Sequence, residues 1–368
     1  MKIAQVVFEM VAGGAEIMAL TLSEQLVKQN HQVDLIRVNA PNDITRERIE
    51  ADHLNNIGIQ SHLLNRKLGK LGINSIIKLI KLINKEKYDI VHSHLMMPDA
   101  YVAFAKILCH HKFTHIITVH SASGYHPNYL LKSLFRQSIF VKCSPAIKKL
   151  NSVKKEHIVL NAVDIAKFSP KNNTQLPSII EELKLPSISR IIISVGNLRP
   201  EKNQILGIKM MHHLIEHHKI ANLHYVICGH GPELSNLKNE VKNLNIVSNV
   251  HFLGSRNDIP SLLQLSEIFF NFSTYEGLPL GVLEAFASGI ITVLSPIEQH
   301  TVIGSNMTEC YFPKNFEVDS FAKVFCDLAS KPKTSTKSEV SEKRKELMEE
   351  YSLDNFTDKY LKIYKNHS

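Results

Sequence analysis

The sequence predicts an α/β protein built from two Rossmann-like, doubly wound domains that face a central cleft. Short apolar runs alternate with amphipathic stretches, this alternation stops once in a Pro-containing segment, and it then starts again. Such alternation favours a parallel sheet with helices on both faces. In addition, a chain of 368 residues is too long for one ordinary hydrophobic core.

Apolar runs of strand length define both halves. In the first half they are Ile3–Phe8, Gln32–Val38, Gln60–Leu64, Ile90–His92, His115–His120, Ile139–Ser144 and His157–Leu160. In the second half they are Arg190–Val195, Leu223–Cys228, Val250–Leu253, Ile268–Phe272, Ile291–Leu294 and Cys310–Phe312. Helical patterns lie between them, as in Ala15–Lys28 and Ile73–Lys85. In the second of these helices we expect one buried face made of Ile73, Ile76, Ile77, Ile80 and Ile83.

A change of composition places the domain boundary. The segment Phe168–Ser189 is rich in Ser, Pro, Asn and Lys. We therefore expect an N-terminal domain over 1–168 and a C-terminal domain over 169–350. Aromatic residues with helical spacing near the end predict that 351–368 form a helix packed back on the N-terminal domain.

The net charge of +8 is unevenly distributed. Residues 1–160 hold 21 of the 43 Lys and Arg and 12 of the 35 Asp and Glu, hence +9, which leaves 22 and 23, hence −1, for residues 161–368. The basic half predicts an anionic partner such as a membrane surface or a lipid phosphate; compositional drift is the alternative. We expect no nucleic-acid partner.

The chain predicts no membrane span, because it lacks an apolar stretch of 18 residues. It also lacks the pattern of a secretory signal, and its five cysteines are scattered, as expected of reduced thiols in a cytoplasmic protein. We therefore expect a cytoplasmic enzyme that is peripheral on the inner face of the plasma membrane if the basic half binds lipid. The segment Tyr129–Arg136 mixes bulky apolar residues with two cations and fits either a membrane interface or a core-facing helix.

Glu276 and Glu284 bracket a predicted loop-to-helix segment after a strand. Pro279 fits the first helical position, and Glu284 lies about one and a half turns inside at roughly 3.6 residues per turn. Free N–H groups at a helix start favour a bound anion. The segment therefore offers amides to a phosphate and carboxylates to hydroxyl groups, as a nucleotide sugar requires. A pair of glycosidase acids is the alternative that this segment alone leaves open.

Cations and glycines follow other strands. Arg199 and Lys202 come after Gly196 and Asn197 at the end of a strand, where ligands of such folds bind. Arginine suits bidentate contact with phosphate and lysine acts as a point charge, although a solvent-exposed loop is the alternative. Gly13, Gly14 and Gly229 also follow strands, and they fit either close backbone approach to a phosphate or plain tight turns.

Seven motifs together resemble the retaining GT-B glycosyltransferases of family GT4. They are Gly13–Glu16, His92–His94, Val119–Ser121, Asn161–Asp164, Gly196–Lys202, Gly229–Glu233 and Glu276–Glu284. The match spans roughly residues 3–312, with the motifs in the family's order and spacing.

The resemblance implies roles for individual residues. Glu284 resembles the carboxylate that binds the ribose hydroxyls of the donor, and Glu276 resembles the one that holds hydroxyls of the transferred sugar. The residues implied in catalysis are His120, Glu276, Lys202 and Arg199. The residues implied in donor binding are Gly13, Gly14, Gly196, Asn197, Arg199, Lys202, Gly229, Ser255, Arg256, Glu276, Gly277, Leu280, Gly281, Val282 and Glu284.

Residues on the acceptor side are less closely defined. The candidates are Glu16, His94, Asp99 and Tyr101, with helix capping an equal alternative for the last two. We expect His92 and His94 to point to opposite faces of their strand, with one lining the cleft. His213 and His217 have a spacing that can bind zinc, but no third ligand is apparent, so no metal site is expected.

The sequence departs from the family pattern at three places. Asn197 stands where many relatives carry Arg, His230 replaces a small or acidic residue, and Ser295–Thr301 lacks the common Gly-Gly and the Glu that follows. The last departure leaves the identity of the donor sugar open.

The predicted function is retaining transfer of a hexose-type sugar from a nucleoside-diphosphate sugar, with UDP favoured over GDP. The acceptor implied is a saccharide or lipid-linked saccharide in the synthesis of bacterial surface polysaccharide, such as lipopolysaccharide or capsule. We expect neither a cofactor nor a metal requirement. The alternatives are a nucleotide-sugar epimerase or phosphorylase on the same scaffold, and a non-catalytic subunit that binds saccharide or membrane.

Overall fold

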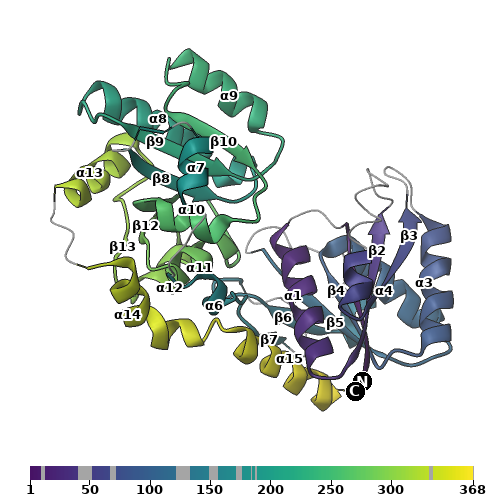
Figure 1. The fold of residues 1–368 in the computed structure, drawn as a ribbon. Coiled ribbons are helices and arrows are strands. Elements are labelled where there is room, and N and C mark those ends of the chain that lie inside the picture. Colours follow the sequence, from purple (N-terminus) through teal and green to yellow (C-terminus); the bar gives the residue numbers. More distant parts are fainter. Residues whose placement is uncertain are drawn as a thin grey trace. The chain divides into compact units, whose positions relative to one another are not determined.

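The computed structural model of the protein describes residues 1–9, 13–39, 52–66, 72–121, 133–148, 156–170, 176–183, 185–186, 189–330 and 335–367. The chain divides into two compact units (Figure 1). Unit 1 comprises Met1–Ala162 and Leu353–Ser368, and unit 2 comprises Val163–Ser352. Each unit has one sheet in which all strand pairs are parallel, as the strand–helix alternation predicts.

Unit 1 is a doubly wound α/β domain. Its elements are β1 Lys2–Val7, α1 Gly14–Lys28, β2 Gln32–Asn39, β3 Ile59–Arg66, α3 Ile73–Glu86, β4 Ile90–His94, α4 Met96–Leu108, β5 Thr114–Val119, η1 Phe135–Gln137, β6 Ile139–Lys142, β7 Glu156–Ile158 and α15 Leu353–His367. The strand order β3-β2-β1-β4-β5-β6-β7 reverses direction between β1 and β4. Ligands of open α/β sheets bind beyond the carboxyl ends of the strands at such a switch point.

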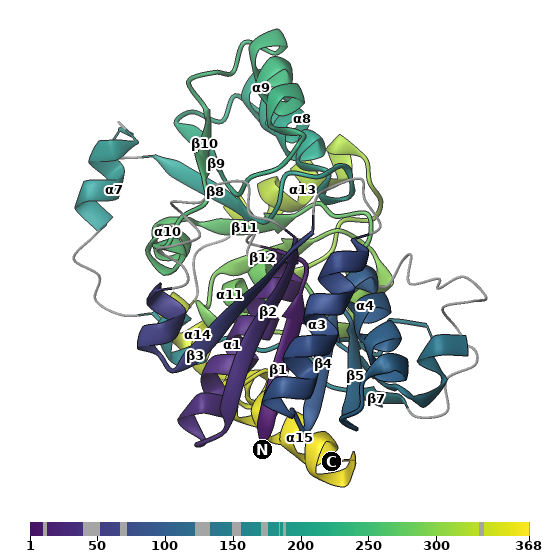
Figure 2. The same ribbon diagram turned by 90° about the vertical axis from the view of Figure 1, so that its right-hand side faces the viewer.

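Two hydrophobic clusters cover opposite faces of this sheet. Leu79 and Ile83 of α3 pack with Ala4, Val6 and strand β2 on one face. On the other face α1 packs against alternate residues of the same strands, and α15 lies beside α1 in both views (Figures 1 and 2). Each helix therefore buries one stripe of apolar residues against the sheet.

The expected apolar face of α3 is partly wrong. Ile73 is 65% exposed and Ile77 is 44% exposed. The buried positions are Ser75, Leu79 and Ile83, because α3 turns the i, i+4, i+8 stripe of these residues toward the sheet.

The C-terminal helix α15 is part of unit 1. Phe356, Tyr360 and Tyr364 are buried, and both chain ends lie close together (Figure 1). The border falls between Ala162 and Val163, before the expected break at Phe168, because α6 packs against a helix of unit 2.

Unit 2 repeats the doubly wound plan. Its elements are α6 Ile165–Phe168, α7 Leu176–Glu182, β8 Arg190–Val195, η2 Pro200–Lys202, α8 Gln204–Glu216, β9 Leu223–Cys228, α9 Leu234–Asn243, β10 Val250–Gly254, α10 Ile259–Leu265, β11 Ile268–Asn271, α11 Leu280–Ala287, β12 Ile291–Leu294, α12 Glu298–Gly304, β13 Cys310–Tyr311, α13 Val318–Ala329 and α14 Lys337–Glu349. The order β10-β9-β8-β11-β12-β13 reverses between β8 and β11. Buried residues of α8, α9 and α13 form one large cluster with the strands.

A buried arginine fastens α14 to the back of α11. Arg344 is fully buried, and its guanidinium donates to the backbone oxygens of Thr308 and Glu309 at 2.8 and 3.2 Å and to that of Phe286 at 3.2 Å. The charge also lies near the carbonyl end of α11, where a cation is favourable. The charged sequence of residues 331–350 suggests a solvated helical face, but α14 within it also buries this arginine; residues 331–334 lie outside the described part of the chain.

Candidate active site

The two glutamates flank the loop and helix that follow β11. The loop carries Glu276, and α11 begins one residue after Pro279, which is its N-cap residue. The expected helix start is therefore right to within one position. Because β11 and β8 are neighbours at the switch point, this loop and the turn after β8 emerge at the same edge of the sheet.

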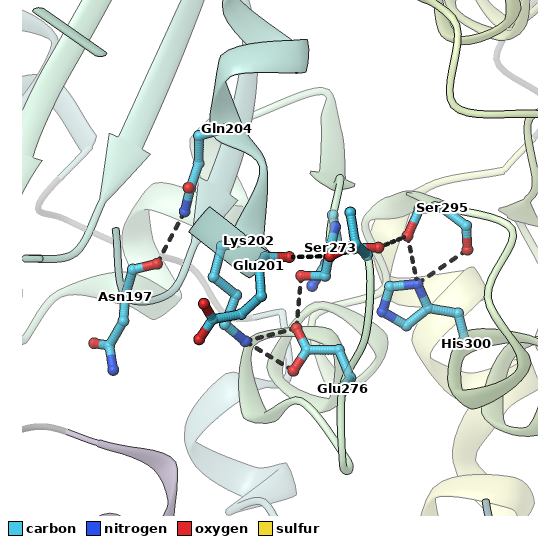
Figure 3. A network of polar contacts seen from close by, with 10 residues as sticks. Asn197, Glu201, Lys202, Gln204, Ser273, Glu276, Ser295 and His300 are labelled. Atoms are coloured by element: carbon cyan, nitrogen blue, oxygen red, sulfur yellow. Dashed lines mark hydrogen bonds and ion pairs between the residues drawn. The ribbon is translucent and has the colours of Figure 1, made fainter. Parts of the chain in front are cut away.

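Glu276 is a buried carboxylate held by a lysine. Lys202 Nζ lies 2.6 Å from Oε1 and 2.8 Å from Oε2 of Glu276, and the Ser273 hydroxyl donates to Oε1 at 2.7 Å (Figure 3). Burial alone would raise the pKa of Glu276, but the charge of Lys202 and the hydrogen bonds from Lys202 and Ser273 outweigh burial and lower it. Glu276 is therefore ionised at neutral pH and acts as a hydrogen-bond acceptor.

A fully buried histidine of α12 connects the unusual segment Ser295–Thr301, whose second half is the start of this helix, to the loop of Glu276. His300 Nδ1 lies 3.0 Å from the backbone oxygen of Ser295, whose hydroxyl donates to the backbone oxygen of Ser273 (Figure 3). A carbonyl only accepts, so His300 Nδ1 carries the proton and Nε2 carries the lone pair. Burial lowers the pKa of His300 to about 4, which keeps the ring neutral.

Glu284 lies in a different environment. Its carboxyl group is half-buried in α11 and makes no side-chain hydrogen bond to the residues that the structure describes. Burial raises the pKa of Glu284 to about 7, and the charge of Lys167 opposes this only in part. A half-buried carboxyl group without a partner is suited to accept hydrogen bonds from hydroxyl groups of a ligand.

The two expected cations, Arg199 and Lys202, differ in their contacts with other side chains. Arg199 is exposed, and its guanidinium makes no hydrogen bond or ion pair within the described ranges. Lys202 is neutralised by Glu276. Arg199 is therefore the cation in this turn that is available to an anion, and Lys202 must share its charge between Glu276 and any phosphate.

The start of α11 presents backbone donors. The Leu280 and Gly281 amides have no hydrogen-bond acceptor among the described residues, whereas the Val282 amide donates to the backbone oxygen of Pro279 at 3.2 Å. A Cβ at Gly281 would lie 2.7 Å from the backbone oxygen of Val195, so only glycine lets α11 begin this close to the end of β8. Of the three expected amides, two are thus free for an anion.

The remaining glycine turns bring backbone segments into contact. A Cβ at Gly229 would collide with the backbone oxygen of Gly196, so the turns after β8 and β9 lie against each other. Asn197 lies in the first of these turns, where its backbone oxygen accepts a hydrogen bond from Gln204 at 3.1 Å (Figure 3). Gly277 lies in the loop beside Glu276.

The side chain of Arg256, the residue after Ser255, is already bound by carboxylates. Its guanidinium contacts Asp258 at 2.8 and 2.7 Å and Glu182 at 2.7 and 3.0 Å. The Arg256 side chain therefore stabilises its own loop. The backbone groups of that loop remain available to bind a ligand. His230, one of the departures from the family pattern, is exposed and packs against Gly254 of the same loop.

In unit 1 an acid sits at the start of α1. Gly13 is the N-cap residue and Gly14 the first helical residue. A Cβ at Gly13 would collide with the Glu16 carboxylate, so this acid is folded back over the helix start. An anionic ligand at Gly13 and Gly14 would therefore meet Glu16. Ala12, the preceding residue of the motif, lies outside the described part of the chain, as do residues 129–132 of the segment considered for membrane contact.

His94 and His120 are brought together. His94 Nδ1 lies 2.9 Å from His120 Nε2, and the two belong to the ends of the neighbouring strands β4 and β5. The expectation that His92 and His94 diverge is wrong: their ring centroids are 4.2 Å apart and both rings are buried. Residues two apart on a strand share a face, and the side chain between them, Ser93, points the other way.

The two remaining acceptor candidates are buried inside unit 1. Asp99 is fully buried and accepts a hydrogen bond from Ser93 at 2.6 Å. Tyr101 is 5% exposed, and its hydroxyl packs against Gly72. Because α4 begins at Met96 with Leu95 as its N-cap residue, both residues lie within the helix and neither is its cap, and their place on the acceptor side stays a prediction.

The described residues offer neither a metal site nor a membrane-spanning helix. They contain no group of three or more His, Cys, Asp or Glu side chains placed to hold a metal ion. His213 and His217 have ring centroids 4.8 Å apart, without such a third ligand. Within the same ranges no helix is both long and apolar enough to cross a membrane.

Sequence reasoning missed the residues that orient the expected ones. Ser273, Ser295 and His300 support Glu276, and no motif marks them (Figure 3). The departure of the Ser295–Thr301 loop from the family pattern was the one available signal. Tyr360 and Tyr364 were expected to pack, but nothing in their helical spacing indicates that their hydroxyls bond to Thr118 and His92 of the sheet.

The fold of two parallel-sheet α/β domains is that of the GT-B glycosyltransferases. A structure from Rickettsia africae described as a glycosyltransferase matches 99% of this chain and 98% of its own with a TM-score of 0.81 and 19% sequence identity. Anabaena HepE, solved in complex with UDP-glucose, matches 99% of each chain with a TM-score of 0.81 and 15% identity.

The sequence comparisons then define the family. Residues 12–147 match the family Glycosyltransferase Family 4, and residues 177–347 match Glycosyl transferases group 1. A curated relative from Escherichia coli, UDP-Gal:alpha-D-GlcNAc-diphosphoundecaprenol alpha-1,3-galactosyltransferase, is 29% identical over 278 residues, which cover 68% of each chain. The protein belongs to the GT4 family and is a glycosyltransferase of the GT-B fold.

Proposed function

We propose that the protein is a retaining glycosyltransferase that moves a hexose-type sugar from a UDP-sugar to a saccharide or lipid-linked acceptor in bacterial surface polysaccharide synthesis. The observation that carries the donor proposal is the edge of unit 2 beside the switch point. The turns and helix that follow β8 and β11 carry one cation and two helix amides without a partner in the described part of the chain, together with two carboxylates in contrasting environments.

The leaving diphosphate explains the cation and the amides. When a sugar leaves a nucleoside diphosphate, negative charge builds up on the diphosphate oxygens. Arg199 and the Leu280 and Gly281 amides are donors suited to stabilise that charge, and Lys202 adds to them. Because these groups supply the positive charge, we propose that no metal ion is required.

The carboxylates of Glu276 and Glu284 then bind different parts of the donor. Glu284, which has no hydrogen-bond partner among the described residues, accepts hydrogen bonds from the ribose hydroxyls. Glu276, kept ionised by Lys202, accepts them from hydroxyls of the transferred sugar. With both oxygens of Glu276 bonded, it is poorly suited to attack the anomeric carbon. We therefore place transfer in the retaining, front-side class that the family resemblance implies, with a leaving phosphate oxygen helping to take the acceptor proton.

Unit 1 is proposed to bind the acceptor and to contribute His120 near the reacting centre. The lipid-linked acceptor is supported by the printed name of the Escherichia coli relative and by the excess of positive charge in residues 1–160. The same charge supports contact with an anionic membrane surface. UDP is supported by the UDP-glucose bound to Anabaena HepE and by the UDP-sugar in the name of the Escherichia coli relative.

A panel of UDP- and GDP-sugars in a thermal-shift assay tests the donor proposal. A ligand that binds the folded state raises the melting temperature by mass action. We expect one or more UDP-sugars to raise it and GDP-sugars to leave it unchanged. A response to GDP-sugars alone would overturn the choice of nucleotide. Turnover of a donor without acceptor would instead indicate an epimerase.

A further inference from the structure

A chain of buried polar side chains crosses one face of the unit 1 sheet and ends at His120. Its members come from β1, from β4 beside it, from β5 and the residue that follows β5, and from α15, and all except His120 are at most 2% exposed. In order of contact they are Tyr360, Thr118, His92, Tyr364, Gln5, His94 and His120. We call this set the polar chain.

Every link of the polar chain has hydrogen-bond length or lies close to it. The oxygen atoms of Tyr360 and Thr118 are 2.8 Å apart, and Thr118 Oγ1 lies 2.7 Å from His92 Nε2. Tyr364 Oη lies 2.7 Å from His92 Nδ1 and 3.3 Å from Gln5 Nε2.

The last two links lead to the expected catalytic histidine. Gln5 Oε1 lies 2.8 Å from His94 Nε2, and His94 Nδ1 lies 2.9 Å from His120 Nε2. The Nδ1 atom of His120 is buried and has no hydrogen-bond partner among the described residues.

The groups of the polar chain are uncharged at neutral pH. Burial lowers the pKa of His92 and His94 well below the usual value and that of His120 to about 4. Burial also raises the pKa of Tyr360 and Tyr364 above the usual range. Each imidazole therefore carries one proton, and the position of that proton follows from its neighbours.

The Gln5 carboxamide decides which nitrogen of each ring is protonated. Its oxygen only accepts, so His94 Nε2 must donate to it and His94 Nδ1 must hold a lone pair. That lone pair accepts from His120 Nε2, which leaves the lone pair of His120 on Nδ1. Tyr364 accepts from the Gln5 amide group, and in this orientation the carboxamide oxygen faces His94.

We propose that Gln5, His94 and Tyr364 are positioning residues that hold His120 as the Nε2–H tautomer, which leaves the lone pair on Nδ1, the atom through which the ring would accept a hydrogen bond from a substrate hydroxyl. The reversed carboxamide would put a proton on His120 Nδ1. In that state Nδ1 could donate to a substrate oxygen but could not accept a hydrogen bond from a hydroxyl group. The part of the inference that involves substrate rests on the proposed function, whereas the tautomer does not.

Two matched substitutions on α15 test the orientation. Tyr364→Phe removes the acceptor of the Gln5 amide group, while Tyr360→Phe removes a hydroxyl of the same kind from the far end of the polar chain. The full-length protein labelled with 15N-histidine is measured by two-bond 1H–15N NMR, and His120→Asn identifies the signals of that ring.

The inference predicts the Nε2–H tautomer of His120 in the wild type and in Tyr360→Phe. In Tyr364→Phe it predicts a mixture of both tautomers. A wild-type ring protonated on Nδ1, or the same His120 spectrum in both tyrosine variants, would overturn it.

A second pair of variants separates the tautomer from the proposed function. In His94→Asn the Oδ1 atom can take the place of Nδ1 and accept from His120, whereas His94→Leu offers no acceptor. We expect kcat/KM for transfer to fall roughly 10-fold in His94→Leu, the equivalent of about one hydrogen bond, and to recover in His94→Asn. If the tautomer changes as predicted but kcat/KM does not, the positioning of the ring stands and the role of His120 in transfer fails.

Discussion

Glu284→Gln tests the environment and the proposed role of Glu284, because it is expected to change both the stability of the protein and its affinity for UDP. The side chain keeps its shape but loses its charge. The pKa of Glu284 is about 7 in the folded protein against an ordinary value of 4.5. Because the folded-state pKa is the higher one, the unfolded chain releases this proton more readily, and the wild type loses stability as pH rises from about 4.5 through 7.

The size of the effect follows from the difference between these two pKa values. At about 1.36 kcal/mol for each pKa unit, 7 minus 4.5 gives up to about 3.4 kcal/mol of destabilisation well above pH 7, and almost none at pH 4. Glu284→Gln removes this cost. For a unit of this size a gain of about 3 kcal/mol corresponds to roughly 6–12 °C in melting temperature.

The assay is calorimetry of wild type and Glu284→Gln at pH values from 4 to 9, with UDP titrations at pH 8. We expect equal melting temperatures at pH 4, a more stable variant at pH 9, and UDP affinity lower by roughly 10- to 100-fold, because charge-assisted hydrogen bonds to ribose are weakened. A difference in melting temperature that does not change with pH would refute the assigned environment of Glu284. Unchanged UDP affinity would refute its role.

The other predictions concern four residues around the same site. Glu276→Gln is expected to lower kcat for transfer on the order of 10²-fold at saturating donor, measured by UDP release; turnover equal to wild type would remove Glu276 from the sugar site. Arg199→Met is expected to weaken UDP binding roughly 10-fold or more in calorimetric titration without changing the melting temperature, since the side chain is exposed. A loss of stability in place of a loss of affinity would contradict this. Arg344→Met is expected to lower the free energy of unfolding by about 3 kcal/mol or more, because the carbonyls that it bonds are left without donors, while the folded protein binds UDP normally. His300→Phe, compared with wild type on a panel of UDP-sugars, is expected to change the ratio of kcat/KM values between sugars; an unchanged ratio would exclude the Ser295–Thr301 loop from donor selection.

The strands could be predicted from the sequence because parallel strands buried on both faces are nearly continuous apolar runs. The runs Arg190–Val195, Leu223–Cys228 and Ile291–Leu294 coincide with β8, β9 and β12. Helix faces were less certain, as Ile73 and Ile77 of α3 show, because an isoleucine-rich helix offers more apolar residues than one face can bury.

The sequence predicted which residues belong to the candidate site, but not how these residues contact one another. The Gly and Glu motifs identified Glu276 and Lys202, but their ion pair joins residues 74 positions apart. The bond between Gln5 and Tyr364 joins residues 359 positions apart. No periodicity or spacing encodes such pairs, because they depend on how the sheet and α15 assemble. The hydrogen bond between Ser93 and Asp99 was missed for the same reason, since it is seen only once the helix is placed against the strand.

The most direct test of the central claim is 1H NMR of the transfer reaction. The wild-type protein is supplied with the UDP-sugar that binds in the thermal-shift panel and with a lipid-linked saccharide, and the new anomeric signal is followed together with UDP. The account predicts one UDP for each sugar transferred and a product with the anomeric configuration of the donor. A product of inverted configuration, or UDP released without transfer, would contradict it.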